Sequence, residues 1–106
     1  MIHYYRPQGD YGGWGLHSWN EDRPLPGVTW ERPLPQTGTD DFGVYWHIAL
    51  KNFPDGRVNF IIHRGDVKDQ CGKDMSWNVK FSMEIWVVSP ECRIHLSKEE
   101  ALGARR

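Results

Sequence analysis

Short runs of strand-forming residues, separated by turn residues, constrain this chain more than any other feature of its sequence. Runs rich in β-branched and aromatic residues alternate along the 106 residues with clusters of Gly, Pro, Asp and Asn. This spacing predicts an all-β fold, an antiparallel, immunoglobulin-like β-sandwich of about six to eight short strands. We expect strands over residues 2–6, 14–19, 43–50, 58–64, 75–81 and 84–88, with a further short one near 28–30.

The segments between the expected strands carry turn and linker signals. Residues 21–39 are rich in proline and predict a long irregular connection. Residues 53–56 (FPDG), between two expected strands, predict a hairpin turn. Residues 97–106 (SKEEALGARR) begin with a Ser cap and have Glu100 three positions on, which is a capping box. We expect one sandwich module over residues 1–96, and a linker or the start of a following segment over 97–106.

The stretch GDYGGWGLHSWNED, residues 9–22, places two tryptophans and a histidine among turn residues. Because side chains alternate across a strand, Trp14 and Leu16 are expected on the core face. His17 and Trp19 are then adjacent on the outer face, roughly 7 Å apart along the strand. Two flat rings at that spacing form a platform on which the apolar face of a sugar could stack. The alternative is that Trp19 covers the edge of a small core.

Aromatic residues make up 13% of the chain, and six of them are tryptophans. Part of this content must build the core, since each buried ring removes roughly 150–250 Å² from water. We expect packing roles at the core or its edge for Trp30, Trp46, Trp77 and Trp86.

The charge balance argues against several classes of partner. The chain has 13 Lys and Arg against 14 Asp and Glu, for a net charge of −1. A surface for nucleic acid or an anionic membrane usually carries a basic excess, so neither partner is expected. No stretch approaches the roughly 18 consecutive apolar residues of a membrane span. The first ten residues have neither the basic nor the apolar region of a signal peptide, so we expect either a cytoplasmic protein or a piece cut from a longer exported chain.

No arrangement of side chains in the sequence indicates catalysis or a cofactor. Glycoside hydrolysis needs two carboxylates across the scissile bond, whereas most acidic residues here lie in turns or beside basic residues. His47 and His63 lie on expected neighbouring strands and could approach one another, but structural roles are favoured for the histidines. We therefore expect no enzymatic activity, no metal site and no cofactor.

Cys71 and Cys92 are the two cysteines and allow one disulfide. Their spacing matches no zinc-binding pattern, and two ligands do not close a tetrahedral site. Two free thiols are the favoured interpretation, with a disulfide as the alternative.

The loop after residues 58–64 is rich in charge. It contains Lys68, Asp69, Lys73 and Asp74. These side chains offer the donors and acceptors that a ligand rich in hydroxyl groups requires. An ordinary solvated loop is the alternative for any one of them.

Four separated blocks of the sequence resemble one known family. They are IHYYRPQGDYGGWGLHSW, DDFGVYWHIAL, VNFIIHRGDVKD and EIWVV, in that order. Together they resemble the pullulanase-associated domain, also called the family-41 carbohydrate-binding module, over about residues 2–89. The resemblance implies a non-catalytic β-sandwich that binds α-1,4-linked glucans such as starch, glycogen, pullulan and maltooligosaccharides. It also implies an attached pullulanase-type glycoside hydrolase in the same parent chain. We expect that parent protein to act outside the cell or at its surface.

The resemblance also implies roles for particular residues. His17 and Trp19 match two positions that stack on adjacent glucose rings, although some members carry tryptophan at both. Lys68 and Asp74 match a lysine and an aspartate that hydrogen-bond to sugar hydroxyls, with Asp69 as the rival carboxylate. Certain members add a tryptophan just before that lysine, and residues 65–67 (GDV) lack it. The alternative function is a protein–protein interaction sandwich without specificity for sugars.

Overall fold

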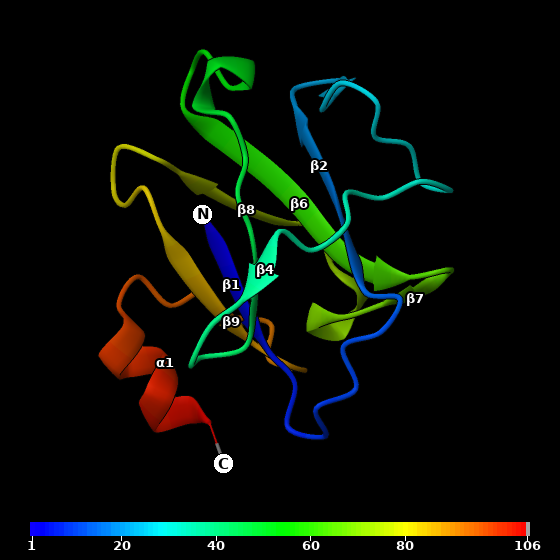
Figure 1. Cartoon of the computed structure of the whole chain (residues 1–106). Coiled ribbons are helices and arrows are strands. Elements are labelled where there is room, and N and C mark those ends of the chain that lie inside the picture. The colour runs from blue at the N-terminus through cyan, green and yellow to red at the C-terminus, as the bar shows by residue number, and fades with distance from the viewer. Residues whose placement is uncertain (106) are drawn as a thin grey trace.

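Two β-sheets pack face to face in the computed structural model, which describes residues 1–105 (Figure 1). The strands are β1 (Ile2–Tyr5), β2 (Gly15–Asn20), β3 (Arg23–Pro24), β4 (Gly38–Thr39), β5 (Val44–Trp46), β6 (Arg57–Arg64), β7 (Val67–Lys68), β8 (Met75–Asn78) and β9 (Ile85–Val88). The helices are η1 (Leu50–Asn52), η2 (Gln70–Gly72) and α1 (Lys98–Ala104). The first sheet has the order β4-β5-β1-β9, and the second has the order β3-β2-β6-β7, with β8 also paired to β6. The predicted all-β sandwich is confirmed.

One pair of strands departs from the expected antiparallel arrangement. β1 pairs with β9 in parallel, and Ile2 lies opposite Ile85. The other strand pairs are antiparallel. The parallel pair joins the first and last strands of the sandwich, which lie side by side in one sheet. The first sheet is therefore mixed.

The proline-rich connection contains no strand near residues 28–30, so that expectation was wrong. Thr29 and Arg32 instead exchange backbone hydrogen bonds of 3.2 and 3.1 Å, which close a tight local turn. The two-residue strands β3 and β4 lie near the ends of the connection. Strand pairing is short there because proline provides no backbone N–H donor.

Residues 53–56 form a turn, but not the predicted hairpin. The Gly56 N–H donates to the Phe53 carbonyl at 2.8 Å, and Gly56 has a φ of +78°. However, β5 belongs to the first sheet and β6 to the second, so the turn carries the chain from one sheet to the other. His47 and His63 are consequently not on neighbouring strands.

Within residues 1–105 no group of three or more His, Cys, Asp or Glu side chains is placed to hold a metal ion.

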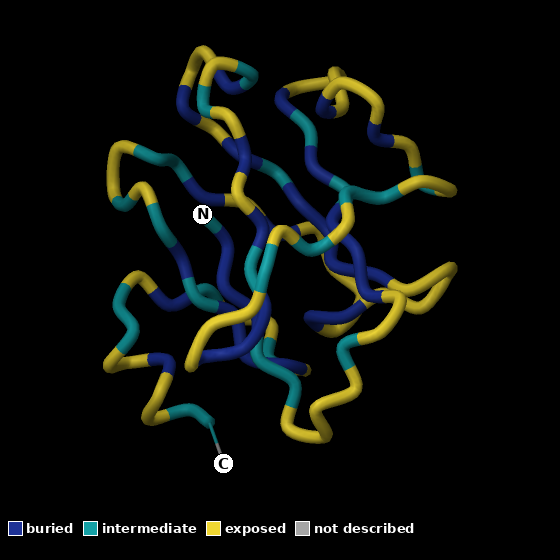
Figure 2. Tube along the Cα trace, viewed as in Figure 1, coloured by how far each residue is buried: buried dark blue, intermediate teal, exposed yellow. Residues whose placement is uncertain are grey.

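The core lies between the sheets and follows the alternation expected for β2. Trp14, Leu16 and Ser18 are buried, whereas His17 and Trp19 remain partly exposed. Figure 2 shows the paired strands largely as buried tube and the connections as exposed tube. The buried Ser18 hydroxyl donates to the Asn59 carbonyl at 2.8 Å. This bond fixes the position of β2 against β6.

The C-terminal helix packs on the first sheet. The Ser97 hydroxyl accepts a hydrogen bond from the Glu100 N–H at 3.2 Å, as the capping box predicts. Ala101 is fully buried in a small cluster with Phe42 and Val88. A helix of this length is marginal in isolation, so these contacts stabilise it. None of the helices in the described part of the chain has the length and apolar character needed to span a membrane.

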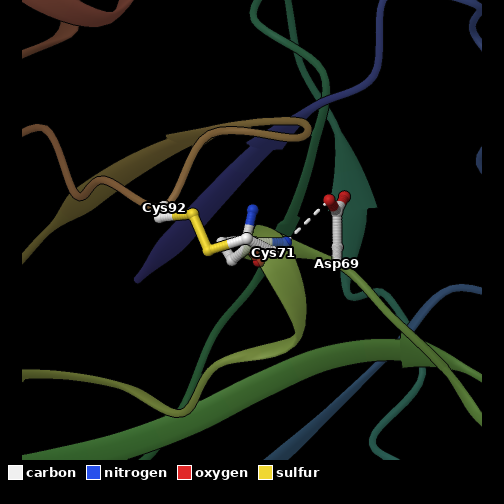
Figure 3. The surroundings of a disulfide bond; sticks show 4 residues. Asp69, Cys71 and Cys92 are labelled. Carbon is white, nitrogen blue, oxygen red and sulfur yellow. Dashed lines mark hydrogen bonds between the residues drawn. A yellow bond between two sulfur atoms is a disulfide. The ribbon is translucent and has the colours of Figure 1, made fainter.

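Cys71 and Cys92 form a disulfide, so the favoured expectation of two free thiols was wrong (Figure 3). Their Cα atoms are 5.7 Å apart. The bond joins η2 to the segment between β9 and α1, and thereby links the second sheet's loop to the first sheet. Asp69 caps the same turn, since its carboxylate accepts from the Gln70 N–H at 2.8 Å. Sequence could not reveal this pair because the approach of the two loops depends on how the sheets pack.

We expect reduction of the disulfide to lower the free energy of unfolding by about 3 kcal/mol, because the closed loop limits the unfolded chain. The two cysteines are 21 positions apart in sequence. Denaturant unfolding with and without a thiol reductant measures the difference. The double variant Cys71→Ala/Cys92→Ala should match the reduced protein, and equal stability of the oxidised and reduced forms would contradict this expectation.

Candidate carbohydrate-binding cleft

The outer face of β2 presents His17 and Trp19 side by side. Their ring centroids are 5.4 Å apart and their planes are inclined by 37°. Trp19 lies between Pro24 of β3 and Asn59 of β6, and His17 lies opposite Ile61. The predicted outward pair is confirmed, although the two rings are inclined rather than coplanar.

Trp30 joins this pair from the proline-rich connection. Its indole stacks on the imidazole of His63 with centroids 3.6 Å apart and planes 2° apart. It also meets His17 edge-on, at 5.7 Å and 77°. Its Nε1–H donates to the Asp66 carboxylate at 3.1 Å.

Trp30 was expected to have a packing role, so its place beside the outward rings was missed. One available signal was its position in the proline-rich connection, between the polar residues Thr29 and Glu31. A large aromatic residue in such a segment has no regular core face to occupy.

The three rings line a cleft of about 640 Å³ on the outer side of the second sheet. Its walls combine apolar rings with a charged rim. The lining residues are His17, Trp19, Glu21, Asp22, Pro24, Trp30, Ile61, Asp66 and Lys68. Flat apolar surface and charged groups thus occur together, as recognition of a ring with a polar rim requires.

Lys68 is the cleft's basic residue. It lies on β7 opposite His63. Its Nζ is 5.6 Å from the centre of the Trp30 ring, and the residue is exposed. The ammonium group can therefore donate hydrogen bonds to a ligand that rests on the rings.

The structure separates the two rival carboxylates. Asp69 is buried, and its carboxylate accepts from the Tyr4 hydroxyl and from the Arg6 guanidinium, the latter at 3.2 Å. Burial and this carboxylate raise the pKa of Tyr4 well above its usual value. Asp69 is thus occupied by contacts inside the fold. Asp74 is exposed, and it is near enough to raise the pKa of His17 electrostatically, although it does not line the cleft.

The two histidines differ in their surroundings. Burial and the nearby His63 lower the pKa of His17, whereas Asp74 and Glu31 oppose that shift. His17 is therefore neutral at neutral pH. His63 Nδ1 lies 2.8 Å from the Gly65 carbonyl, which accepts hydrogen bonds only, so this nitrogen carries the proton.

Three solved structures are similar to this fold. The product complex of SpuA, a multi-modular glycogen-degrading pneumococcal virulence factor, superposes with a TM-score of 0.76 at 22% identity, over 91% of this chain and 10% of that one. Klebsiella pneumoniae pullulanase complexed with maltotriose superposes with a TM-score of 0.75 at 24% identity, over 97% of this chain and 11% of that one. The third structure describes α-glucan recognition by family 41 carbohydrate-binding modules from streptococcal virulence factors. It superposes with a TM-score of 0.71 at 15% identity, over 91% of this chain and 45% of that one. These similarities establish the shared fold.

Sequence comparison gives a relative and a family. An alpha-amylase of Streptomyces lividans is 35% identical over 77 residues, which are 73% of this chain. The chain spans only 8% of that relative's length. The model of the bacterial pullanase-associated domain matches residues 1–96. The chain belongs to the bacterial pullanase-associated domain family.

Proposed function

We propose that this chain is a non-catalytic module that binds α-1,4-linked glucans through the cleft on its second sheet. The observation that carries the proposal is the outward pair of rings, His17 and Trp19, on one strand at a 5.4 Å separation. A pyranose has an apolar face of C–H groups that an aromatic ring can cover, and a rim of hydroxyls that charged groups can bond. The solved relatives support the choice of α-glucan, since one is described by α-glucan recognition and another holds maltotriose.

Each binding residue has a distinct role in this proposal. Trp19 stacks on one glucose ring, and His17 lies on or beside the next. Lys68 donates to sugar hydroxyls from the rim of the cleft. Asp74 accepts from them, in preference to Asp69, because Asp69 is buried and already bonded to Tyr4 and Arg6.

The proposal includes a longer parent chain. Residues 1–96 form the glucan-binding module, and residues 97–106 lead toward the following segment through a helix that packs on the module. The catalytic domain of a pullulanase-type glycoside hydrolase is the expected partner in that chain. Tethering would raise the local concentration of substrate for it. The disulfide supports a parent protein that acts outside the cell, because such bonds persist in oxidising surroundings.

Trp19→Ala should weaken binding of maltotetraose by about 2 kcal/mol, because the substitution removes the exposed ring that anchors the ligand. Isothermal titration calorimetry measures the affinity, and thermal unfolding checks the fold. Phe81→Ala removes another exposed ring, on the loop between β8 and β9, and should bind as the original protein does. A loss below threefold in a folded Trp19→Ala variant would oppose the proposal.

Binding should weaken as the pH falls through the lowered pKa of His17. The imidazole is neutral in the free protein at neutral pH, and a stacked sugar removes more water from it, which lowers its pKa further. Proton release therefore accompanies binding at acidic pH, and full affinity is present above the lowered pKa of His17 in the free protein and is lost as the pH falls through that pKa. Titrations between about pH 8 and pH 5 measure the profile.

His17→Phe keeps a ring without a titratable nitrogen and provides the control for this profile. Its affinity should not change over the same range. An identical decline in His17→Phe would assign the pH dependence to another group.

Substitution of the two rival carboxylates should have opposite consequences. Asp69→Ala leaves the Tyr4 hydroxyl and the Arg6 guanidinium without their buried acceptor, and should lower the free energy of unfolding by about 3 kcal/mol. Asp74→Ala should leave stability within about 0.5 kcal/mol and weaken glucan binding. Denaturant unfolding and calorimetric titration of both variants test this assignment. Intact binding in Asp74→Ala would remove that residue from the site.

A further inference from the structure

Trp30 has no part in the proposed function, although it lines the same cleft as His17 and Trp19. It comes from the irregular connection between β3 and β4 and is only partly buried. Neither a strand register nor the main core cluster accounts for its position.

Three contacts hold the indole of Trp30 in one orientation. One face lies on the ring of His63, the Nε1–H is bonded to Asp66, and His17 meets it edge-on. Asp66 follows Gly65 in the turn between β6 and β7, where Gly65 has a φ of +59°. A preorganised ring of this kind loses little conformational freedom when a ligand rests on it.

The stack of Trp30 on His63 has an unfavourable free-energy contribution, which packing does not explain. His63 is fully buried, and its Nε2 has no hydrogen-bond partner among the described residues. Burying a polar nitrogen without a partner is unfavourable. An aliphatic side chain under Trp30 would support the indole without that cost, so stability alone does not account for the arrangement.

A second indole–imidazole stack in the chain provides a contrast. Trp86 lies over His3 in the first sheet, with centroids 5.0 Å apart and planes 6° apart. There the parallel pairing of β1 and β9 sets the two residues opposite each other, and His3 Nε2 has Glu84 at 2.6 Å. Strand pairing and the contact with Glu84 account for that stack, whereas neither strand pairing nor a carboxylate contact accounts for Trp30 on His63.

We propose that Trp30 is a third stacking platform, which takes the glucose next to the one on His17 and makes maltotriose the smallest ligand that uses the whole site. This rests on the proposed function of the cleft. The plane of Trp30 is turned by 77° from His17, so the bound chain must turn there. Lys68, whose Nζ is 5.6 Å from the Trp30 ring, contacts the same glucose.

The platform ends at Trp30 because the connection then covers the strand. A Cβ atom on Gly15 would lie 2.7 Å from Pro33, so this proline fills the outer side of β2 at that point. Leu34 continues the cover by pairing with Leu16. The outer face of β2 therefore offers no further ring position past His17 other than Trp30.

Calorimetric titration of the folded domain with maltose and with maltotriose tests the assignment. The original protein should bind maltotriose more tightly than maltose. Trp30→Ala should lose about tenfold in affinity for maltotriose and less than twofold for maltose, which Trp19 and His17 hold without it. Trp86→Ala is the matched control, since it also removes a partly buried indole stacked on a buried histidine, and it should change neither affinity.

A second variant keeps the test independent of any packing defect. Asp66→Ala leaves the indole in place and removes only the acceptor of its Nε1–H, so it should weaken maltotriose binding selectively and by less than Trp30→Ala does. Folded Trp30→Ala and Asp66→Ala variants that both retain the original affinity for maltotriose would overturn the role of Trp30. The proposed function survives that result if Trp19→Ala still weakens binding by more than threefold. If the original protein binds neither sugar, the proposed function itself is wrong and the role of Trp30 falls with it.

Discussion

The register between β2 and β6 is the constraint on which both the core and the cleft depend. It sets Leu16 opposite Ile62 on the inner face, and His17 opposite Ile61 on the outer face. Because side chains alternate with a period of two, a slip of one residue would exchange these faces. Leu16 and Ser18 are fully buried, so such a slip would expose them and bury the outward rings. The cleft is therefore held in place by the same burial that stabilises the sandwich.

The local sequence pattern was sufficient to predict features that depend on a single strand. It was insufficient to predict contacts between segments that are distant in the sequence. Alternation predicted the outward His17 and Trp19 correctly, because each position depends only on the strand that carries it. The turn at residues 53–56 was recognised, but a four-residue pattern does not encode which sheet receives the next strand. The approach of Cys71 to Cys92 depends likewise on the packing of two loops from different sheets. Trp30 was missed for the same reason, since its partner His63 lies 33 positions further along the chain.

The charged loop after β6 contains charged side chains with two different roles, one at the cleft and one inside the fold. Lys68 and Asp69 are neighbours in sequence, yet one is exposed at the cleft and the other is buried against Tyr4 and Arg6. The alternation of a strand end turns consecutive side chains in opposite directions. Charge density alone could not separate them, because it records composition and not direction. A buried carboxylate also requires compensating donors, and those come from β1 and the residue after it, in the other sheet.

The proposed site is rigid, which suits the flexible glucan proposed as its ligand. Two of the cleft's rings, His17 and Trp19, stand on a strand that is hydrogen-bonded on both edges, and the third is fixed by His63 and Asp66. Almost all of the ordering cost on binding then falls on the oligosaccharide. Exposed platforms bury limited area and sugar hydroxyls must give up water, so the proposed binding would have modest affinity. Modest affinity favours a tethered role, because a module that releases its glucan readily can keep a catalytic partner near substrate without holding the chain in one place.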